Sequence, residues 1–133
     1  MAPELQLVAR RPMATLVVKL KKGIVMALPH AAAGEIVRIE PMGSTVIEGT
    51  KTHALVKGDR FEAARLVLPR GSAIAPHAVP GPITLYCIEG AITLEANRTV
   101  EMRAGDWLYL EGGERHALTA IEDSSLLLTI IFP

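Results

Sequence analysis

The sequence predicts an all-β fold, a sandwich or barrel of short antiparallel strands. Short runs rich in Val, Ile, Leu and Thr recur along the chain, and turns containing glycine or proline separate them. Almost no stretch has the 3.6-residue period of an amphipathic helix. The chain of 133 residues is long enough for one domain with a full hydrophobic core.

Composition excludes several function classes. Lys and Arg together number 14 and so do Asp and Glu, so no charge excess favours a polyanion such as nucleic acid as a partner. A single cysteine, Cys87, excludes an internal disulfide framework and a metal site built from several cysteines. No apolar run is long enough to span a bilayer, and the apolar run 24–28 ends at Pro29, too early for a secretory signal. We therefore expect a cytoplasmic protein with no membrane partner.

The first 50 residues are expected to form an arm with extra strands before the main domain. Residues 1–13 have little periodicity and predict an irregular arm. A hairpin over 16–28, turning at Lys21-Lys22-Gly23, competes with a short helix over 13–20. After a loop or single helical turn at 30–34, strands are expected at 35–40 and 45–47.

The remaining residues, 51–133, are expected to form the barrel. Residues 52–68 predict a β-hairpin that turns at Lys57-Gly58-Asp59. Because proline cannot donate to a sheet, residues 75–82, with Pro76, Pro80 and Pro82, are expected at an edge or in a loop at the rim. Further strands are expected at 83–88, 91–96, 99–103, 107–110, 116–121 and 126–132.

Glycines and histidines between Gly71 and His116 follow two spaced motifs. The first has the form G-x5-H-x-H-x3-E-x6-G, and its positions are occupied here by Gly71, His77, Val79, Ile83 and Gly90. The second is roughly G-x5-P-x-G-x2-H-x3-N, and its positions are occupied by Gly105, Glu111, Gly113, His116 and Ala120. This pattern resembles the cupin family over residues 60–133, which implies a small single-domain jelly-roll barrel, a double-stranded β-helix.

The same resemblance implies a transition metal inside the barrel, held by three histidines and a glutamate. Only His77 and His116 are present here, because Val79 and Ile83 stand where the family has the other His and the Glu. A divalent ion prefers three or more N, O or S ligands, so two imidazoles hold it weakly. We therefore expect a degenerate metal site and no bound cofactor, with His77 and His116 as the candidate ligands of any metal. His53 is a possible third ligand, although an ordinary strand histidine on the outer face is the more common case.

Residues at positions i, i+2 and i+6 of a strand share one face, so His77, Val79 and Ile83 are expected to point together into the barrel. The predicted ligand pocket consists of His77, Val79, Ile83, Leu85, His116 and Leu118. The two histidines are either an acid–base pair or polar lining that is hydrogen-bonded to backbone or water.

Three functions follow as hypotheses. The first is binding of a small organic ligand in a mostly aliphatic barrel. The second is a metal-dependent enzyme of dioxygenase or isomerase type, which needs substitute ligands beside the two histidines. The third is an interaction module, a homodimer in which the first 40 residues cover a partner's edge strand.

Other residues have simpler interpretations. Cys87 is expected in the core and Tyr86 on the outer sheet face, because successive side chains of a strand point to opposite faces. Trp107 is expected to pack. The arginines are either an anion clamp at the rim or ordinary solvated and interface residues; they are Arg60, Arg65 and Arg70.

Overall fold

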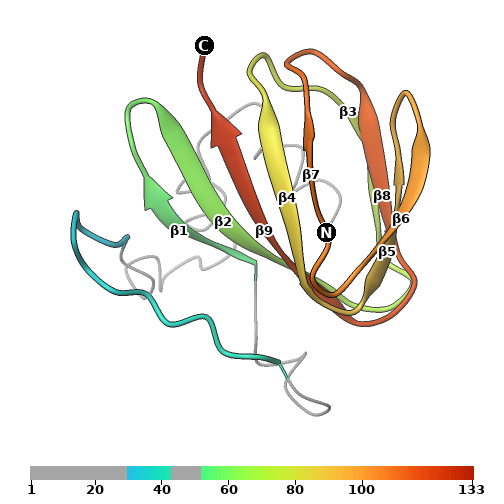
Figure 1. Ribbon diagram of the computed structural model, residues 1–133, viewed down its shortest axis with the longest axis horizontal. Helices are drawn as coiled ribbons and strands as arrows, with labels where there is room; N and C mark the ends of the chain where they lie inside the picture. Colours follow the sequence, from blue (N-terminus) through green and yellow to red (C-terminus); the bar gives the residue numbers. More distant parts are fainter. Residues whose placement is uncertain (1–29, 43–51) are drawn as a thin grey trace, which may run out of the picture.

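The computed structural model describes residues 30–42 and 52–133, and their strands form two antiparallel sheets (Figure 1). The five-stranded sheet has the order β1-β2-β9-β4-β7, and the four-stranded sheet has the order β3-β8-β5-β6. The strands are β1 (His53–Lys57), β2 (Phe61–Leu68), β3 (Ala73–His77), β4 (Ile83–Glu89), β5 (Ala91–Glu95), β6 (Thr99–Arg103), β7 (Trp107–Leu110), β8 (His116–Ala120) and β9 (Ser124–Ile131). The fold is the predicted all-β jelly-roll barrel.

Most of the predicted strands are confirmed to within two residues at each end. The hairpin over 52–68 is the antiparallel pair β1–β2. As the prolines indicated, β3 lies at the edge of its sheet and carries Pro76. The predicted hairpin at 16–28 and the strand at 45–47 lie outside the described residues, and the division at residue 50 stays a prediction.

The strand predicted at 35–40 is wrong. The segment follows a turn at Ala33-Gly34 and then runs without regular secondary structure, and the Ile36 side chain is 86% exposed. Among residues 35–40 only Ile39 is partly buried, so the alternating pattern creates no buried face. The Glu35 side chain instead accepts a hydrogen bond from the Ala32 N–H, which favours the turn over an extended ladder.

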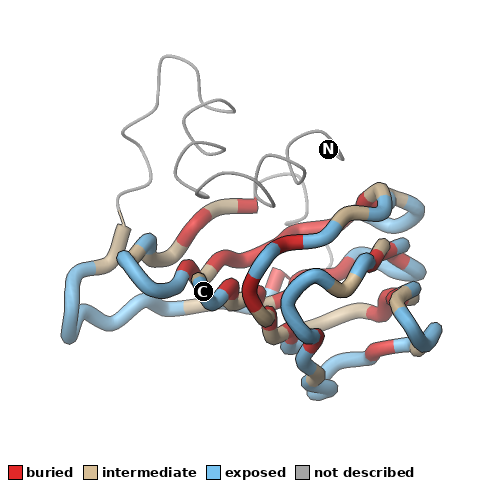
Figure 2. Tube along the Cα trace, turned by 90° about the horizontal axis from the view of Figure 1, so that it is seen from above, coloured by how far each residue is buried: buried red, intermediate tan, exposed pale blue. Residues whose placement is uncertain are grey.

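The hydrophobic core fills the space between the two sheets. In Figure 2 the buried residues gather along the strands, whereas the turns between them are largely exposed. Along β4 the inward residues Ile83, Leu85 and Cys87 are at most 4% exposed, and Tyr86 between them is 39% exposed. The predicted positions of Cys87 in the core and Tyr86 outside are confirmed. Burial of this kind stabilises a fold by roughly 25 cal/mol per Å² of apolar surface.

The packing role predicted for Trp107 is wrong. Its side chain is 59% exposed, because it lies opposite Tyr86 in the β4–β7 ladder and shares that residue's outward face. The inward positions of β7 belong to Leu108 and Leu110, which contact the core. Trp107 instead stands beside Tyr109 on the outside, with ring centroids 6.4 Å apart.

A buried polar network lies at the end of the five-stranded sheet. The Glu89 carboxylate accepts hydrogen bonds from Arg65 Nη2 at 3.0 Å, from Ser125 Oγ at 2.9 Å and from the Met42 N–H at 2.9 Å. Arg65 therefore has a structural partner, and the anion clamp considered for it has no support. The network also fixes the segment that ends at Met42 against the sheet.

Candidate functional site

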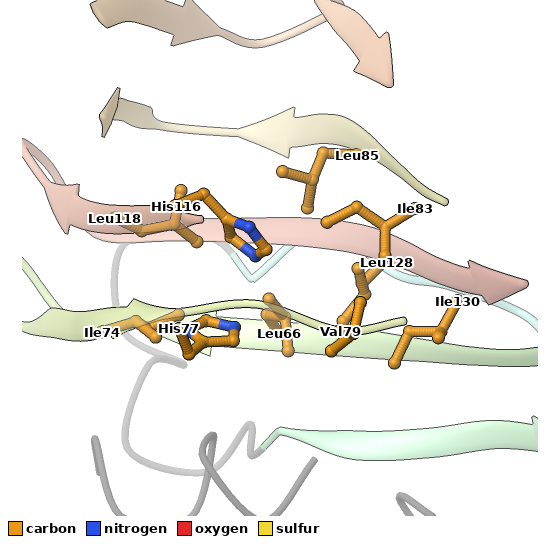
Figure 3. Close-up of a pocket in the computed structure, with 10 residues that line it drawn as sticks. All are labelled: Leu66, Ile74, His77, Val79, Ile83, Leu85, His116, Leu118, Leu128 and Ile130. Carbon is orange, nitrogen blue, oxygen red and sulfur yellow. The ribbon is translucent and has the colours of Figure 1, made fainter. Parts of the chain in front are cut away.

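Ten side chains line a cavity inside the barrel (Figure 3). They come from five strands and from the loop that follows β3. The volume of the cavity is about 30 Å³, room for one or two water molecules. Eight of the ten side chains are aliphatic and the other two are histidines. The lining consists of Leu66, Ile74, His77, Val79, Ile83, Leu85, His116, Leu118, Leu128 and Ile130.

The structure brings all six residues of the predicted pocket to this cavity. Four further lining residues were not predicted. Leu66, Leu128 and Ile130 lie outside the two motifs, and Ile74 lies at an unspecified position of the first motif. The alternation of inward and outward residues along a strand was the signal that could have identified them. Leu66, Leu128 and Ile130 are each flanked in β2 or β9 by residues of the opposite face, and all three belong to the core.

A β-bulge turns His77 into the cavity. Ile74 is paired with Leu118 and His77 with His116, so three steps along β3 match two steps along β8. Without the bulge, alternation would place Pro76 on the inner face beside Ile74 and His77 on the outer face. The bulge therefore allows Ile74 and His77 to face inward from the same strand.

The two histidine rings lie next to each other. Their centroids are 4.4 Å apart and their planes meet at 60°, an edge-on arrangement. Figure 3 shows both rings beside Leu66 and Val79 in the same space. His116 is only 5% exposed, whereas His77 is half-buried.

Each ring is held by the backbone carbonyl two residues before it. His77 Nδ1 lies 2.9 Å from the Ala75 carbonyl oxygen, and His116 Nδ1 lies 2.9 Å from the Glu114 carbonyl oxygen. A carbonyl oxygen only accepts, so Nδ1 carries the hydrogen in both rings. In the neutral form, each Nε2 is then a hydrogen-bond acceptor.

The surroundings favour the neutral form of His116. Burial lowers the pKa of His116 below its usual value of 6.5, and the nearby His77 lowers it further, although the hydrogen bond to Glu114 acts in the opposite direction. An imidazolium would lose its hydration among aliphatic side chains. At neutral pH His116 Nε2 is therefore an uncharged hydrogen-bond acceptor.

The donor set does not suit a resident divalent metal ion. Two imidazoles among eight aliphatic side chains supply fewer than the three ligands that such ions usually take from a protein. Within residues 30–42 and 52–133, no group of three or more His, Cys, Asp or Glu side chains gathers where a metal could bind. His53 does not join the pair; it lies in β1, at the edge of the five-stranded sheet, and does not line the cavity.

His116 also borders a wider and shallower groove on the surface. The groove has a volume of about 280 Å³ and a more polar lining. Its other lining residues are Pro76, Glu95, Ala96, Asn97, Arg115 and Ala117. The charged residues near the site therefore belong to the groove and not to the cavity.

In the described part of the chain, no helix is present that would reach across a bilayer. No curated protein matches the sequence. Among solved structures, a conserved protein of unknown function from Streptococcus pyogenes is similar, with 21% identity and a TM-score of 0.62 over 77% of this chain and 98% of that chain. A RmlC-like cupin from Shewanella frigidimarina has 21% identity and a TM-score of 0.61 over 79% of this chain and 92% of that chain. A cupin superfamily protein from Desulfitobacterium hafniense has 13% identity and a TM-score of 0.60 over 92% of this chain and 89% of that chain.

These structural likenesses are distant in sequence, and they show the fold alone. The family is shown by a sequence model of the cupin domain, which matches residues 64–132, more than half of the chain. The matched range includes every residue that lines the cavity. The chain therefore belongs to the cupin family.

Proposed function

We propose that this cupin binds a small, mostly apolar organic molecule in the barrel cavity. The observation that carries the proposal is the composition of the lining, in which two adjacent histidines are the polar side chains among eight aliphatic ones. Concave, largely apolar sites with a few polar groups that fix orientation are typical of small-molecule binding.

The size of the cavity limits what enters it. A volume of about 30 Å³ receives only a few atoms without movement of the lining. Ligand entry therefore requires either a molecule of a few heavy atoms or rotation of the aliphatic side chains that line the cavity. Val79 and Ile83 are the side chains that replace the polar residues of the family motif, so they are the first candidates for this movement.

A fragment titration followed by methyl NMR tests the proposal. Small alcohols and ketones added to the protein are expected to shift the methyl signals of cavity residues such as Val79, Ile83 and Leu118. Leu118→Phe is expected to fill the cavity and to abolish these shifts. The matched control is Leu127→Phe, which changes the same residue type at a partly exposed position that does not line the cavity. If no small probe shifts the cavity methyls of the unmodified protein, the proposal is wrong.

A metal-dependent dioxygenase or isomerase, the alternative expected from the family, needs ligands beyond His77 and His116. The described residues offer no such cluster, so no observation favours this function over ligand binding. Elemental analysis of protein purified without chelator tests it directly. Stoichiometric metal that is lost in His77→Ala would reinstate the alternative.

A further inference from the structure

The two histidines restrict the chemistry of the ligand, and this inference rests on the proposed function. Both Nδ1–H groups are already used in hydrogen bonds to the carbonyls of Ala75 and Glu114. Each ring therefore has one unused position, Nε2. Within the described residues, the two Nδ1 atoms make hydrogen bonds and the two Nε2 atoms make none.

Both Nε2 atoms are acceptors while the rings are neutral. The other eight lining side chains are aliphatic, so they offer neither a donor nor a charge to a ligand. The polar groups that the cavity side chains offer to a ligand are thus two neighbouring lone pairs, one on each Nε2 atom. An incoming carboxylate or phosphate would meet these lone pairs without a donor or cation to compensate for its lost hydration.

We infer that the ligand enters this cavity with a hydrogen-bond donor, a hydroxyl or N–H group, directed at Nε2 of His77 or of His116. A molecule of the same shape that has only acceptors leaves those nitrogens unpaired. A site built around a polar contact discriminates strongly against an analogue that lacks the matching group. The specific ligand class is therefore a small neutral alcohol or amide with an aliphatic body, and not an organic acid.

Three matched probes test this inference: 2-butanol, 2-butanone and isobutyrate. The first two share a carbon skeleton and differ in the presence of a donor, whereas isobutyrate carries a negative charge. Binding is followed by methyl NMR at neutral pH. We expect 2-butanol to bind about tenfold more tightly than 2-butanone, which is the order of effect of one hydrogen bond, and isobutyrate to bind more weakly still.

His116→Phe keeps a planar ring but removes one of the two acceptors, so it is expected to reduce the preference for 2-butanol over 2-butanone, and the double variant His77→Phe, His116→Phe is expected to abolish it. His53→Phe makes the same change outside the cavity and is expected to retain the tenfold preference. The ring nitrogen shifts of the unmodified protein provide a test that needs no variant. They are expected to show the Nδ1–H tautomer for both histidines.

The outcomes separate the two proposals. Tighter binding of 2-butanone or isobutyrate, or an Nε2–H tautomer in either ring, overturns the inference and leaves ligand binding in the barrel intact. If isobutyrate binds most tightly and Arg115→Gln removes this preference, the anion binds in the outer groove and not in the cavity. Failure of all three probes to shift the cavity methyls contradicts the proposed function itself, and the inference with it.

Discussion

His77 and His116 stand directly opposite each other in the β3–β8 ladder, with their ring centroids 4.4 Å apart. Each ring donates through Nδ1 to the carbonyl two residues before it, so the same local arrangement is used on both strands. Two titratable rings thus share one small aliphatic cavity. We expect the free energy of adding a charge there to affect both the pH dependence of the fold and the choice of ligand.

Acid is expected to destabilise the fold through His116. Its pKa is lowered in the folded protein, first by burial and then by His77, although Glu114 partly opposes this. Below the usual value of 6.5 the unfolded chain therefore binds a proton that the folded chain does not. The free energy of unfolding should fall as the pH drops through the range from 6.5 to the lowered pKa. Urea unfolding at several pH values between about 5 and 7.5 measures this slope.

His116→Phe is the variant that should reduce this slope, because phenylalanine has no proton to gain. His53→Phe serves as its control, because it makes the same change at a histidine that does not line the cavity. An acid slope that survives in His116→Phe would assign the effect to other groups.

The bulge in β3 is expected to absorb one extra residue between Ile74 and His77. Deleting Ala75 would leave His77 two residues after Ile74, so simple alternation alone should keep its side chain on the inner face opposite His116. The through-space NMR contacts between the two rings should therefore persist in this deletion. Deleting Gly112, in the loop before β8, shortens a neighbouring rim loop and is the comparison for general loss of stability. Loss of the ring contacts in a folded Ala75 deletion would show that the bulge itself, and not alternation, directs His77 inward.

Glu89→Gln is expected to be costly, because it leaves the Arg65 guanidinium buried without its carboxylate partner. Arg65 is 7% exposed at its side chain and its Nε already has no hydrogen-bond partner within the described residues. Breaking a buried ion pair of this kind costs about 3 kcal/mol of unfolding free energy. Glu40→Gln is the matched control, since its pair with Arg38 is largely exposed and should contribute almost nothing. Equal unfolding midpoints in urea for the two variants would refute the expectation.

The predicted homodimer stays a prediction, and the outer face of the five-stranded sheet offers a surface on which to test it. Tyr86, Trp107 and Tyr109 are 39%, 59% and 54% exposed, and they lie together on β4 and β7. Contiguous exposed aromatic surface is unusual on a monomer. If a second copy covers this face, Trp107→Lys should lower the sedimentation coefficient to that of a monomer. Thr93→Lys, on the outer face of the other sheet, should not. A monomer before any substitution removes the homodimer.

Local signals in the sequence predicted the strands well where turn residues and alternation agreed, as in the hairpin that ends at Leu68 and in the strand that begins at Ile83. They failed where exposure depends on a neighbour that the sequence does not reveal. Residues 35–40 alternate like a strand but have no ladder partner, and Trp107 looks like a packing residue but has outward parity. Motif spacing and strand alternation predicted six of the ten cavity residues but not the bulge at β3, since a bulge appears only when two strands are paired.

Restoring the two missing polar residues should create a metal site. In the family motif, Val79 and Ile83 occupy the positions of a histidine and a glutamate, and in the structure both line the cavity with His77 and His116. The double variant Val79→His, Ile83→Glu therefore offers three imidazoles and a carboxylate, a donor set that suits Zn²⁺. Isothermal titration calorimetry should show binding at least about 100-fold tighter than that of the unmodified protein. The variant without metal should be less stable, because it buries a carboxylate among aliphatic side chains, and Zn²⁺ should restore its stability. The His77→Ala version of the double variant should lose the gain in affinity. Equally tight binding by the unmodified protein would mean that further donors complete the site, and would contradict the conclusion that its own donor set does not suit a resident metal.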